Sequence, residues 1–525
     1  MRVRRLLIVV ATVCAVAGGT LWVSPTGAVT PGTLVVGLVA EPTSMDPGQL
    51  TDINSMRVLS NVYDTLVQFA PGTFTLEPGL ATSWSISPDG LQYTFKLRRG
   101  VVFQDGTPFG AAAVKFTYDR LLDPQNPYHD TGPFPFAPFY YGAIQSTAVI
   151  DSSTVRFTLK HPFSPLLHNF TLNTGRIVSP AAVKKWGKDF ASHPVGTGPF
   201  TFVSWQKNVR IVLQRNPRYW GGAPKLAQLI FRPLPDDQTR VTELLNGGVD
   251  FIVDVPPDNL AQLKKDARFQ VYQAPGPHIW WVTLNTRIKP FNDVRVRQAV
   301  NYAVNKAAIC RDVLKGTCTP ADGPIPPAVT WAFDPQVKGY PYDPAKAKAL
   351  LGEAGYPSGF SGTFWIPESG SGMQSPKIMA EAIQADLANV GVKVSIQTYE
   401  WGAYLNQYGK GLGSAEMGAM SFMLDPGDPA PMLSLVVDGA AISPKGFNSG
   451  YYDDPKVNRL LQQASTVESQ SKRGALYRQA SAIIAQDAPW IFIDNALQTA
   501  ATTRREHGFV LSPTFYLFFQ GTAVQ

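Results

Sequence analysis

The sequence has little charge and few of the residues that usually hold metals. Charged residues make up 16% of the 525 positions, and there are only 3 cysteines and 6 histidines. The histidines are scattered, no His-Glu-x-x-His pattern occurs, and the cysteines form no cluster. Because a zinc site needs such a set of ligands, we expect neither a metal site nor a cofactor.

Motifs of catalysis and of nucleotide binding are missing as well. No Gly-x-x-x-x-Gly-Lys-[Ser/Thr] loop occurs, and the glycines of "GTGPF" at 196–200 lack the spacing of a dinucleotide site. The stretch "ESGSGM" around Ser371 lacks the spacing of a nucleophile elbow. We therefore expect a protein that is not an enzyme. A site assembled from distant residues leaves no local motif, so a secreted hydrolase is the alternative.

The net charge of +7 is too weak to indicate a nucleic-acid partner. Part of it is a group of arginines within the first five residues, directly before the apolar run 6–23. Small residues follow up to Ala28, so segment 1–28 is typical of a secretory signal peptide. We expect a periplasmic or otherwise extracytoplasmic protein, with an uncleaved membrane anchor as the alternative.

The cysteines outside the first apolar run are Cys310 and Cys318. In an oxidising compartment they can form a local disulfide, and two separate thiols are the alternative. Such a short loop would add at most ~2–3 kcal/mol in the loop-entropy account of disulfides. Cys14 lies inside the apolar run directly after Val13, which does not favour lipidation.

The length suggests about three domains, and the sequence pattern indicates mixed α/β construction. Alternating apolar residues at 93–97 and at 155–159 predict strands with one buried face. Apolar residues recur every three or four positions over 293–316, which predicts one helix that starts at Asp293. Near Gly391 a helical pattern passes directly into a strand pattern, as in α/β folds.

Several segments resemble one family, and they occur in its order. They are "LVAEPTSMDP", "SWSISPDGLQYTFKLRRGVVFQDGTPF", "VGTGPFTFVSW", "LNTRIKPFNDVRVRQAVNYAVNK" and "YDPAKAKALLGEAGYP". The family comprises the extracytoplasmic solute-binding proteins (family 5) of ABC importers for peptides and nickel, and the resemblance covers nearly the whole mature chain. Asn305-Lys306 departs from the acidic–basic pair that is frequent there, and Phe422 stands where Trp is frequent.

The resemblance implies an α/β fold of the bilobal periplasmic-binding-protein type (class II), with an extra α+β domain inserted in the first lobe. The two lobes would share a hinge near 279–280 and 493–494. The implied boundaries are 29–75, 193–279 and 494–525 for lobe I, 76–192 for the inserted domain, and 280–493 for lobe II.

The resemblance also implies a function. A monomer would capture a short peptide, a dipeptide or an oligopeptide, by closing its lobes, and would present it to an ABC permease in the membrane. The alternatives are another small solute in the same fold, namely a nickel chelate, an oligosaccharide, an opine or haem. An envelope sensor or chaperone without an importer is a further alternative.

The stretch "SFMLDPGDPAPML", 421–433, places two aspartates in apolar surroundings. Asp-Pro-Gly-Asp-Pro is turn-forming, and a turn explains Asp428. In peptide-binding members of the family, an aromatic residue three positions before an Asp marks the carboxylate that binds the ligand's α-amino group. Phe422 and Asp425 have that spacing, so the resemblance implies that Asp425 anchors the amino terminus.

Other ligand-contacting positions follow from the same resemblance. Trp401, in "YEWGAYL", matches a family position that faces the ligand, and Glu41, Pro42 and Thr43 match the loop beside it. For Glu41 a solvated loop carboxylate is an equal alternative. Adjacent residues of a strand point to opposite faces, so only one of the pair at 280–281 can serve the ligand, and we expect Trp280.

Overall fold

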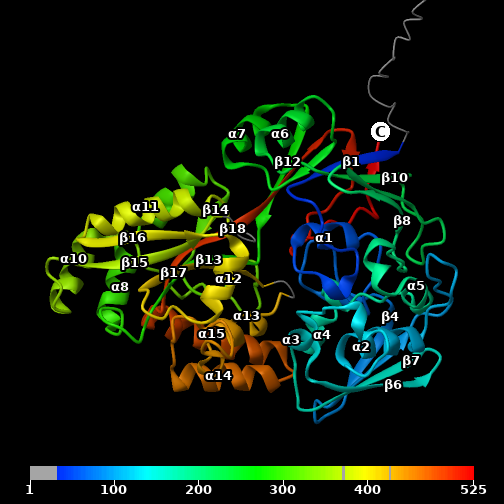
Figure 1. The fold of residues 1–525 in the computed structure, drawn as a ribbon, viewed down its shortest axis with the longest axis horizontal. Helices are drawn as coiled ribbons and strands as arrows, with labels where there is room; N and C mark the ends of the chain where they lie inside the picture. The colour runs from blue at the N-terminus through cyan, green and yellow to red at the C-terminus, as the bar shows by residue number, and fades with distance from the viewer. Residues whose placement is uncertain (1–31, 369–372, 425–426) are drawn as a thin grey trace, which may run out of the picture.

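The structure is a computed structural model that describes residues 32–368, 373–424 and 427–525. The predicted signal peptide and Asp425 lie outside the described residues. Figure 1 shows two lobes side by side, with a further domain beneath the first lobe. Each of these three bodies has its own buried core of aliphatic and aromatic side chains.

Lobe I contains one end of the large sheet, in the order β11-β1-β10-β9-β8. Strand β1 pairs in parallel with both β10 and β11, so its buried run reads as continuous apolar sequence. The strands are β1 (Thr33–Leu38), β8 (Phe200–Gln206), β9 (Arg210–Arg215), β10 (Gln228–Pro233), β11 (Phe251–Val253) and β12 (Phe269–Pro275). The helices are α1 (Ile53–Leu59), α6 (Asp237–Leu245) and α7 (Pro257–Lys265). A small hairpin of β2 (Val67–Phe69) and β3 (Leu76–Pro78) leads into the inserted domain and packs against its core.

The inserted domain is an antiparallel sheet in the order β4-β5-β7-β6, against which α2 packs. Its strand β5 buries Tyr93, Phe95 and Leu97, which confirms the alternation predicted from the sequence. The strands are β4 (Ala81–Ile86), β5 (Gln92–Leu97), β6 (Ile144–Asp151) and β7 (Thr154–Leu159). The helices are α2 (Ala111–Leu122), α3 (Ala137–Tyr141), α4 (Leu166–Asn169) and α5 (Pro180–Trp186).

Lobe II contains the other end of the sheet, in the order β16-β15-β17-β13. The strands are β13 (His278–Leu284), β14 (Cys318–Pro320), β15 (Phe360–Pro367), β16 (Val392–Tyr399) and β17 (Met417–Met423). The helices are α8 (Val294–Ala303), α9 (Lys306–Ala308), α10 (Pro344–Glu353), α11 (Pro376–Ala388), α12 (Trp401–Gly409), α13 (Ala430–Val436), α14 (Pro455–Thr466) and α15 (Gln470–Asp487).

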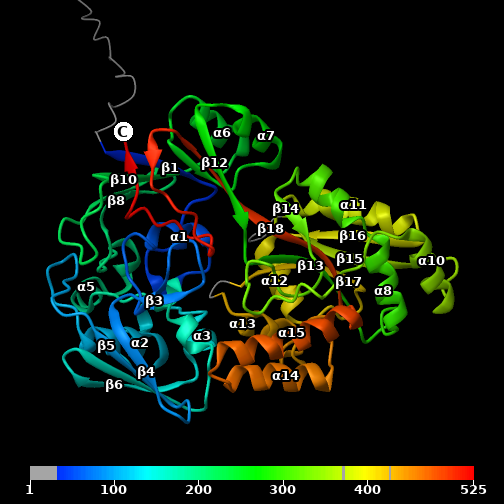
Figure 2. The same cartoon turned by 180° about the vertical axis from the view of Figure 1, so that it is seen from behind.

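One strand, β18 (Trp490–Thr503), belongs to both lobes. In lobe II it pairs with β13 and β14, and in lobe I with β11 and β12. Seen from behind, β12 and β18 run together from lobe I into lobe II (Figure 2). The strand changes partner between Asp494, which pairs with Trp280, and Leu497, which pairs with Pro275.

The single helix predicted over 293–316 is wrong. Helix α8 ends at Ala303, and after Val304 the short α9 starts a new helical segment. Asn305 caps it by accepting a hydrogen bond from Ala308 N at 3.0 Å, while its own backbone N–H donates to Asp386. The break therefore depends on a contact with α11 that the local pattern does not contain.

The sulfur atoms of Cys310 and Cys318 are bonded to each other in the structure. The bond ties the segment after α9 to the start of β14. Because β14 pairs with β18, this disulfide lies next to the strand that connects the lobes.

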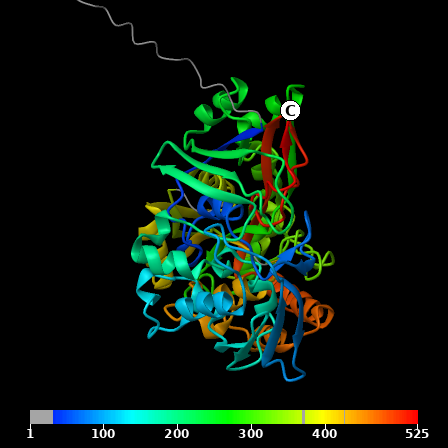
Figure 3. The same cartoon turned by 90° about the vertical axis from the view of Figure 1, so that its right-hand side faces the viewer.

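The residue-level boundaries of the lobes stay predictions. Side chains of α5, which the boundary map assigns to the inserted domain, pack into the core of lobe I. The C terminus lies on the same side of the molecule as β1, away from the inserted domain (Figure 3). Within the described ranges, no helix is long and apolar enough to cross a bilayer.

Candidate functional site

The loop after β1 carries Glu41, Pro42 and Thr43. Glu41 accepts a hydrogen bond from the indole N–H of Trp205 at 2.6 Å, so it is not a freely solvated carboxylate. Its second oxygen is buried and has no hydrogen-bond partner among the described residues. Thr43 donates its hydroxyl to Asp52 at 2.6 Å, which fixes it at the start of α1.

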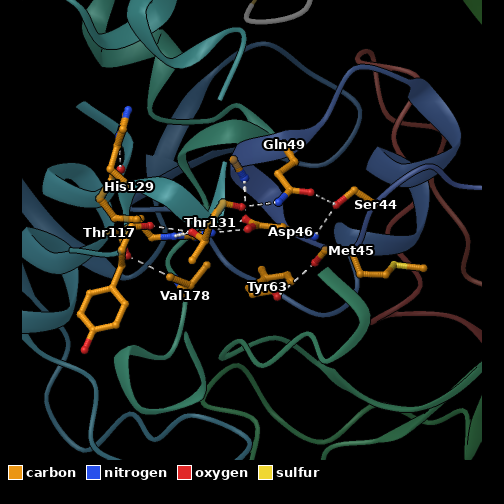
Figure 4. Close-up of polar contacts among 12 residues, drawn as sticks. Ser44, Met45, Asp46, Gln49, Tyr63, Thr117, His129, Thr131 and Val178 are labelled. Atoms are coloured by element: carbon orange, nitrogen blue, oxygen red, sulfur yellow. Dashed lines mark hydrogen bonds and ion pairs between the residues drawn. The ribbon is translucent and has the colours of Figure 1, made fainter. Parts of the chain in front are cut away.

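The continuation of this loop is bound to the inserted domain. Asp46 is fully buried and pairs with the guanidinium of Arg120 on α2. Gln49 donates to the carbonyl of Thr131 at 2.6 Å, and Figure 4 shows how Ser44, Gln49 and Thr131 connect in one chain of hydrogen bonds. Residues 41–43 are therefore held in place by the polar contacts that the next residues, 44–49, make with the inserted domain.

The sheet of lobe II separates two of the predicted ligand residues. Trp280 pairs with Ser421 of β17, whereas Phe422 pairs with Ile279. Paired residues share a face and successive residues alternate, so Trp280 and Phe422 point to opposite faces of the sheet. Trp281, on the face of Phe422, stacks on Trp490 in the core with ring centroids 4.3 Å apart.

Trp401 and Phe422 lie on the same side. Trp401 is the first residue of α12, and the Tyr408 hydroxyl of this helix lies 2.6 Å from that of Thr283. Thr283 shares a face with Trp281, so α12 covers the face that carries Phe422. Both predicted aromatics are half-buried and pack against the core of lobe II.

The turn interpretation of Asp428 is incomplete. The carboxylate does accept a hydrogen bond from Ala430 N at 2.9 Å, as a turn-forming Asp does. It is also fully buried and pairs with the guanidinium of Arg473 on α15. Asp428 is therefore one half of a buried ion pair, and its partner lies 45 residues further along the chain.

The inserted domain contacts lobe II at this ion pair. The ring of His168, on α4, stacks on Trp331 of lobe II with centroids 6.1 Å apart, and its Nδ1 lies 3.9 Å from Asp428 Oδ2. Burial lowers the pKa of His168 to about 4, so the ring is neutral. Nearby, the Tyr93 hydroxyl donates to Glu468 at 3.0 Å, which adds a second contact between the two bodies.

Asp494 is a residue at the crossing of the lobes that the sequence interpretation did not single out. Its side chain lies in β18 beside Trp280, on the same face. Burial raises the pKa of this carboxyl to about 8. The signal in the sequence is one acidic residue directly after the apolar run Trp490–Ile493.

Two hollows of the structure lie away from these residues. Cavities of about 440 and 320 Å³ flank the segment 338–340 of lobe II, and none of the predicted ligand residues that the structure describes lines them. Within the described residues, no group of three or more His, Cys, Asp or Glu side chains is placed to hold a metal ion.

Comparison with known proteins identifies the family. Residues 75–444 match the bacterial extracellular solute-binding proteins, family 5. The chain is 37% identical to heme-binding protein A of Haemophilus influenzae, over 92% of this chain and 90% of that protein. It is 33% identical to the glutathione-binding protein GsiB of Pectobacterium atrosepticum, over 98% of both.

Solved structures agree with the sequence relatives. HbpA2 from Haemophilus parasuis matches with a TM-score of 0.85 and 32% identity, over 94% of this chain and 100% of that one. The ABC transporter-associated periplasmic binding protein DppA from Helicobacter pylori, in complex with the peptide STSA, matches with a TM-score of 0.80 and 34% identity, over 94% and 98%. The chain therefore belongs to family 5 of the bacterial extracellular solute-binding proteins.

Proposed function

We propose that this chain captures short peptides between its lobes and delivers them to an ABC permease. The observation that carries the proposal is the shared two-lobed fold of proteins solved with peptides. Besides the Helicobacter pylori complex, a dipeptide-binding protein from a Pseudoalteromonas species, in complex with Met-Leu, matches with a TM-score of 0.81 over 94% of this chain. A peptide suits such a site because backbone hydrogen bonds bind it and side-chain pockets select it.

Haem is the second candidate ligand, since the relative at 37% identity is named a heme-binding protein. Native mass spectrometry of the protein as purified separates the two candidates by the mass that it retains. A retained peptide mass, or binding of a tripeptide mixture, supports the proposal. If the protein retains haem and binds no peptide, the ligand is haem and the peptide proposal is wrong.

Asp425 remains our proposed anchor for the peptide's α-amino group, although it lies outside the described residues. Phe422 and Trp401, on one side of the β17 end, are the proposed aromatic neighbours of the ligand. An unpaired ammonium in a water-excluded site costs ~3–5 kcal/mol, so Asp425→Asn should weaken binding of free peptides at least about a hundredfold.

N-acetylated peptides provide the control for this anchor. Acetylation removes the ammonium charge, so these peptides should bind poorly to the unmutated protein and equally poorly to the Asp425→Asn variant. Calorimetry with one peptide in both forms measures this. Equal affinity for the free and the acetylated peptide would mean that Asp425 does not bind the α-amino group.

The remaining parts of the proposal concern the state of the exported chain. We propose a monomer that binds without turnover, is cleaved near Ala28, and has its lobe boundaries at the residues implied by the family resemblance. Amino-terminal sequencing, light scattering and incubation with a labelled peptide test these points one by one. An intact Met1 start fixed in a membrane would support the anchor alternative.

A further inference from the structure

Asp494 places a carboxylate in the least polar part of the connecting strand. The four residues before it, Trp490–Ile493, are almost completely buried, and Asp494 itself is only 3% exposed. In the sheet it lies between Trp280 of β13 and Pro320 of β14. These neighbours offer an indole ring and an aliphatic ring, and neither side chain is charged.

Within the described residues, no group donates a hydrogen bond to this carboxylate or forms an ion pair with it. The buried acids Asp46 and Asp428, in contrast, each pair with an arginine. The indole N–H of Trp280 has no acceptor within the described residues either. Further along the same face, both ring nitrogens of His278 and the side-chain N–H of Gln498 have no partner in that set. Unpaired polar groups therefore line one face of β13 and β18 where the strands pass between the lobes.

Burying an unpaired carboxylate costs several kcal/mol, and the group avoids part of that cost by staying protonated. The pKa of about 8 agrees with this state. An asparagine would fill the same space without the cost. A cation that arrives beside the carboxylate removes the cost, because a desolvated pair of opposite charges attracts strongly.

The chemistry of the neighbours selects the kind of cation. The ring face of a tryptophan attracts ammonium and guanidinium groups, and a carboxylate pairs with both. An anionic ligand group would be repelled by the carboxylate, and a purely apolar group would leave it unpaired. The arrangement therefore favours a primary amine or a guanidinium on an aliphatic stem.

We propose that Asp494 and Trp280 form a subsite for a cationic side chain of the captured ligand, a lysine- or arginine-like group. The subsite rests on the proposed peptide capture and deepens it, because it selects among peptides. It is separate from the proposed anchor at Asp425, which concerns the α-amino group.

The test uses matched tripeptides that differ in one charge. Ala-Lys-Ala and Ala-norleucine-Ala have similar stems, and the variable residue is also moved to the first and third positions. Calorimetry at pH 8 with the full mature chain should show at least a tenfold preference for lysine at one position. Asp494→Asn should abolish the preference and leave norleucine peptides unaffected, and Trp280→Phe should reduce it.

Two controls separate the subsite from general effects. Asp312→Asn removes the same charge from an exposed position of lobe II and should leave the lysine preference unchanged. In the unmutated protein the preference should grow at least tenfold from pH 6 to pH 8, because the ligand cation must displace the proton from Asp494. The pH measurement needs no variant, so a failure of Asp494→Asn to fold does not block the test.

Each outcome decides the matter. Equal binding of the lysine and norleucine peptides, or a preference that persists in Asp494→Asn, overturns the subsite and leaves peptide capture standing. If no peptide binds, free arginine and agmatine are the probes. Their binding, lost in Asp494→Asn, supports the cationic subsite and overturns peptide capture, whereas no binding of any basic probe overturns both.

Discussion

Two aspartates, Asp428 and Asp494, are equally buried and differ in what surrounds them. Asp428 is 0% exposed and forms an ion pair with Arg473. It also accepts hydrogen bonds from the Tyr477 hydroxyl and from a backbone N–H, and all three partners belong to its own lobe. Asp494 is 3% exposed, and its carboxyl group has neither an ion pair nor a hydrogen bond with the described residues. Burial alone therefore does not define the role of a carboxylate. Where the fold supplies the cation, the acid is part of the structure, and where it does not, the acid is available to a ligand.

The largest expected effect tests the first half of this comparison. Arg473→Met leaves Asp428 buried without its cation, which should lower the free energy of unfolding by about 3–5 kcal/mol. Urea denaturation of the ligand-free protein measures it. The double variant Asp428→Asn/Arg473→Met should recover part of the loss, because no charge is then left unpaired. A loss under about 1 kcal/mol in the single variant would mean that Asp428 does not depend on its arginine, and the contrast with Asp494 would then be wrong.

The second prediction concerns the pH dependence that Asp494 contributes. Its pKa is about 8 in the folded protein and near 3.9 in the unfolded chain, so between these values the folded state holds the extra proton. The free energy of unfolding then falls as pH rises, by about 1.4 kcal/mol per pH unit. From pH 5 to pH 7 the unmutated protein should lose about 2–3 kcal/mol relative to Asp494→Asn. Parallel curves of unfolding free energy against pH for the two proteins would mean that the pKa of Asp494 is not raised, and the carboxylate would then have a charge or hydrogen-bond partner.

The sequence predicted local patterns well and long-range partners poorly. Alternation identified β5 because burying one face of a strand leaves a period of two in the sequence. The break at Asn305 was missed because it depends on Asp386, and the role of Asp428 was missed because Arg473 lies far along the chain. The family resemblance identified the fold, whereas Asp494 required the register of β18 against β13.

The third prediction concerns His168, which packs against Asp428 from the inserted domain. Its pKa is about 4 in the folded protein against 6.5 when exposed, so its contribution is complete above pH 6.5 and is lost as pH falls toward 4. Between pH 7 and pH 5 the loss should be about 1–2 kcal/mol, and it should be absent in His168→Phe. His278, which has a similarly lowered pKa, stays in both proteins and cancels in the difference. If His168→Phe loses as much unfolding free energy between pH 7 and pH 5 as the unmutated protein, His168 is not the cause of that loss.

The smallest expected effect belongs to a carboxylate that is only partly buried. Glu468 accepts the hydroxyl of Tyr93 across the contact between the inserted domain and lobe II. Tyr93→Phe removes one hydrogen bond and should cost about 1 kcal/mol of unfolding free energy. Thermal denaturation beside the unmutated protein measures it. A cost as large as that of Arg473→Met would mean that this contact, rather than the ion pair, dominates the junction.

The shared strand β18 has a consequence for the order in which the chain can fold. It lies near the C terminus, yet both lobes need it: in lobe I it joins β11 and β12, and in lobe II it flanks β13. The lobe II part of the sheet is not complete before Ala496 has left the ribosome, and the lobe I part is not complete before Thr503 has. Such long-range pairing is slow to form, so we expect both lobes to complete their sheets only after almost the whole chain has been synthesised.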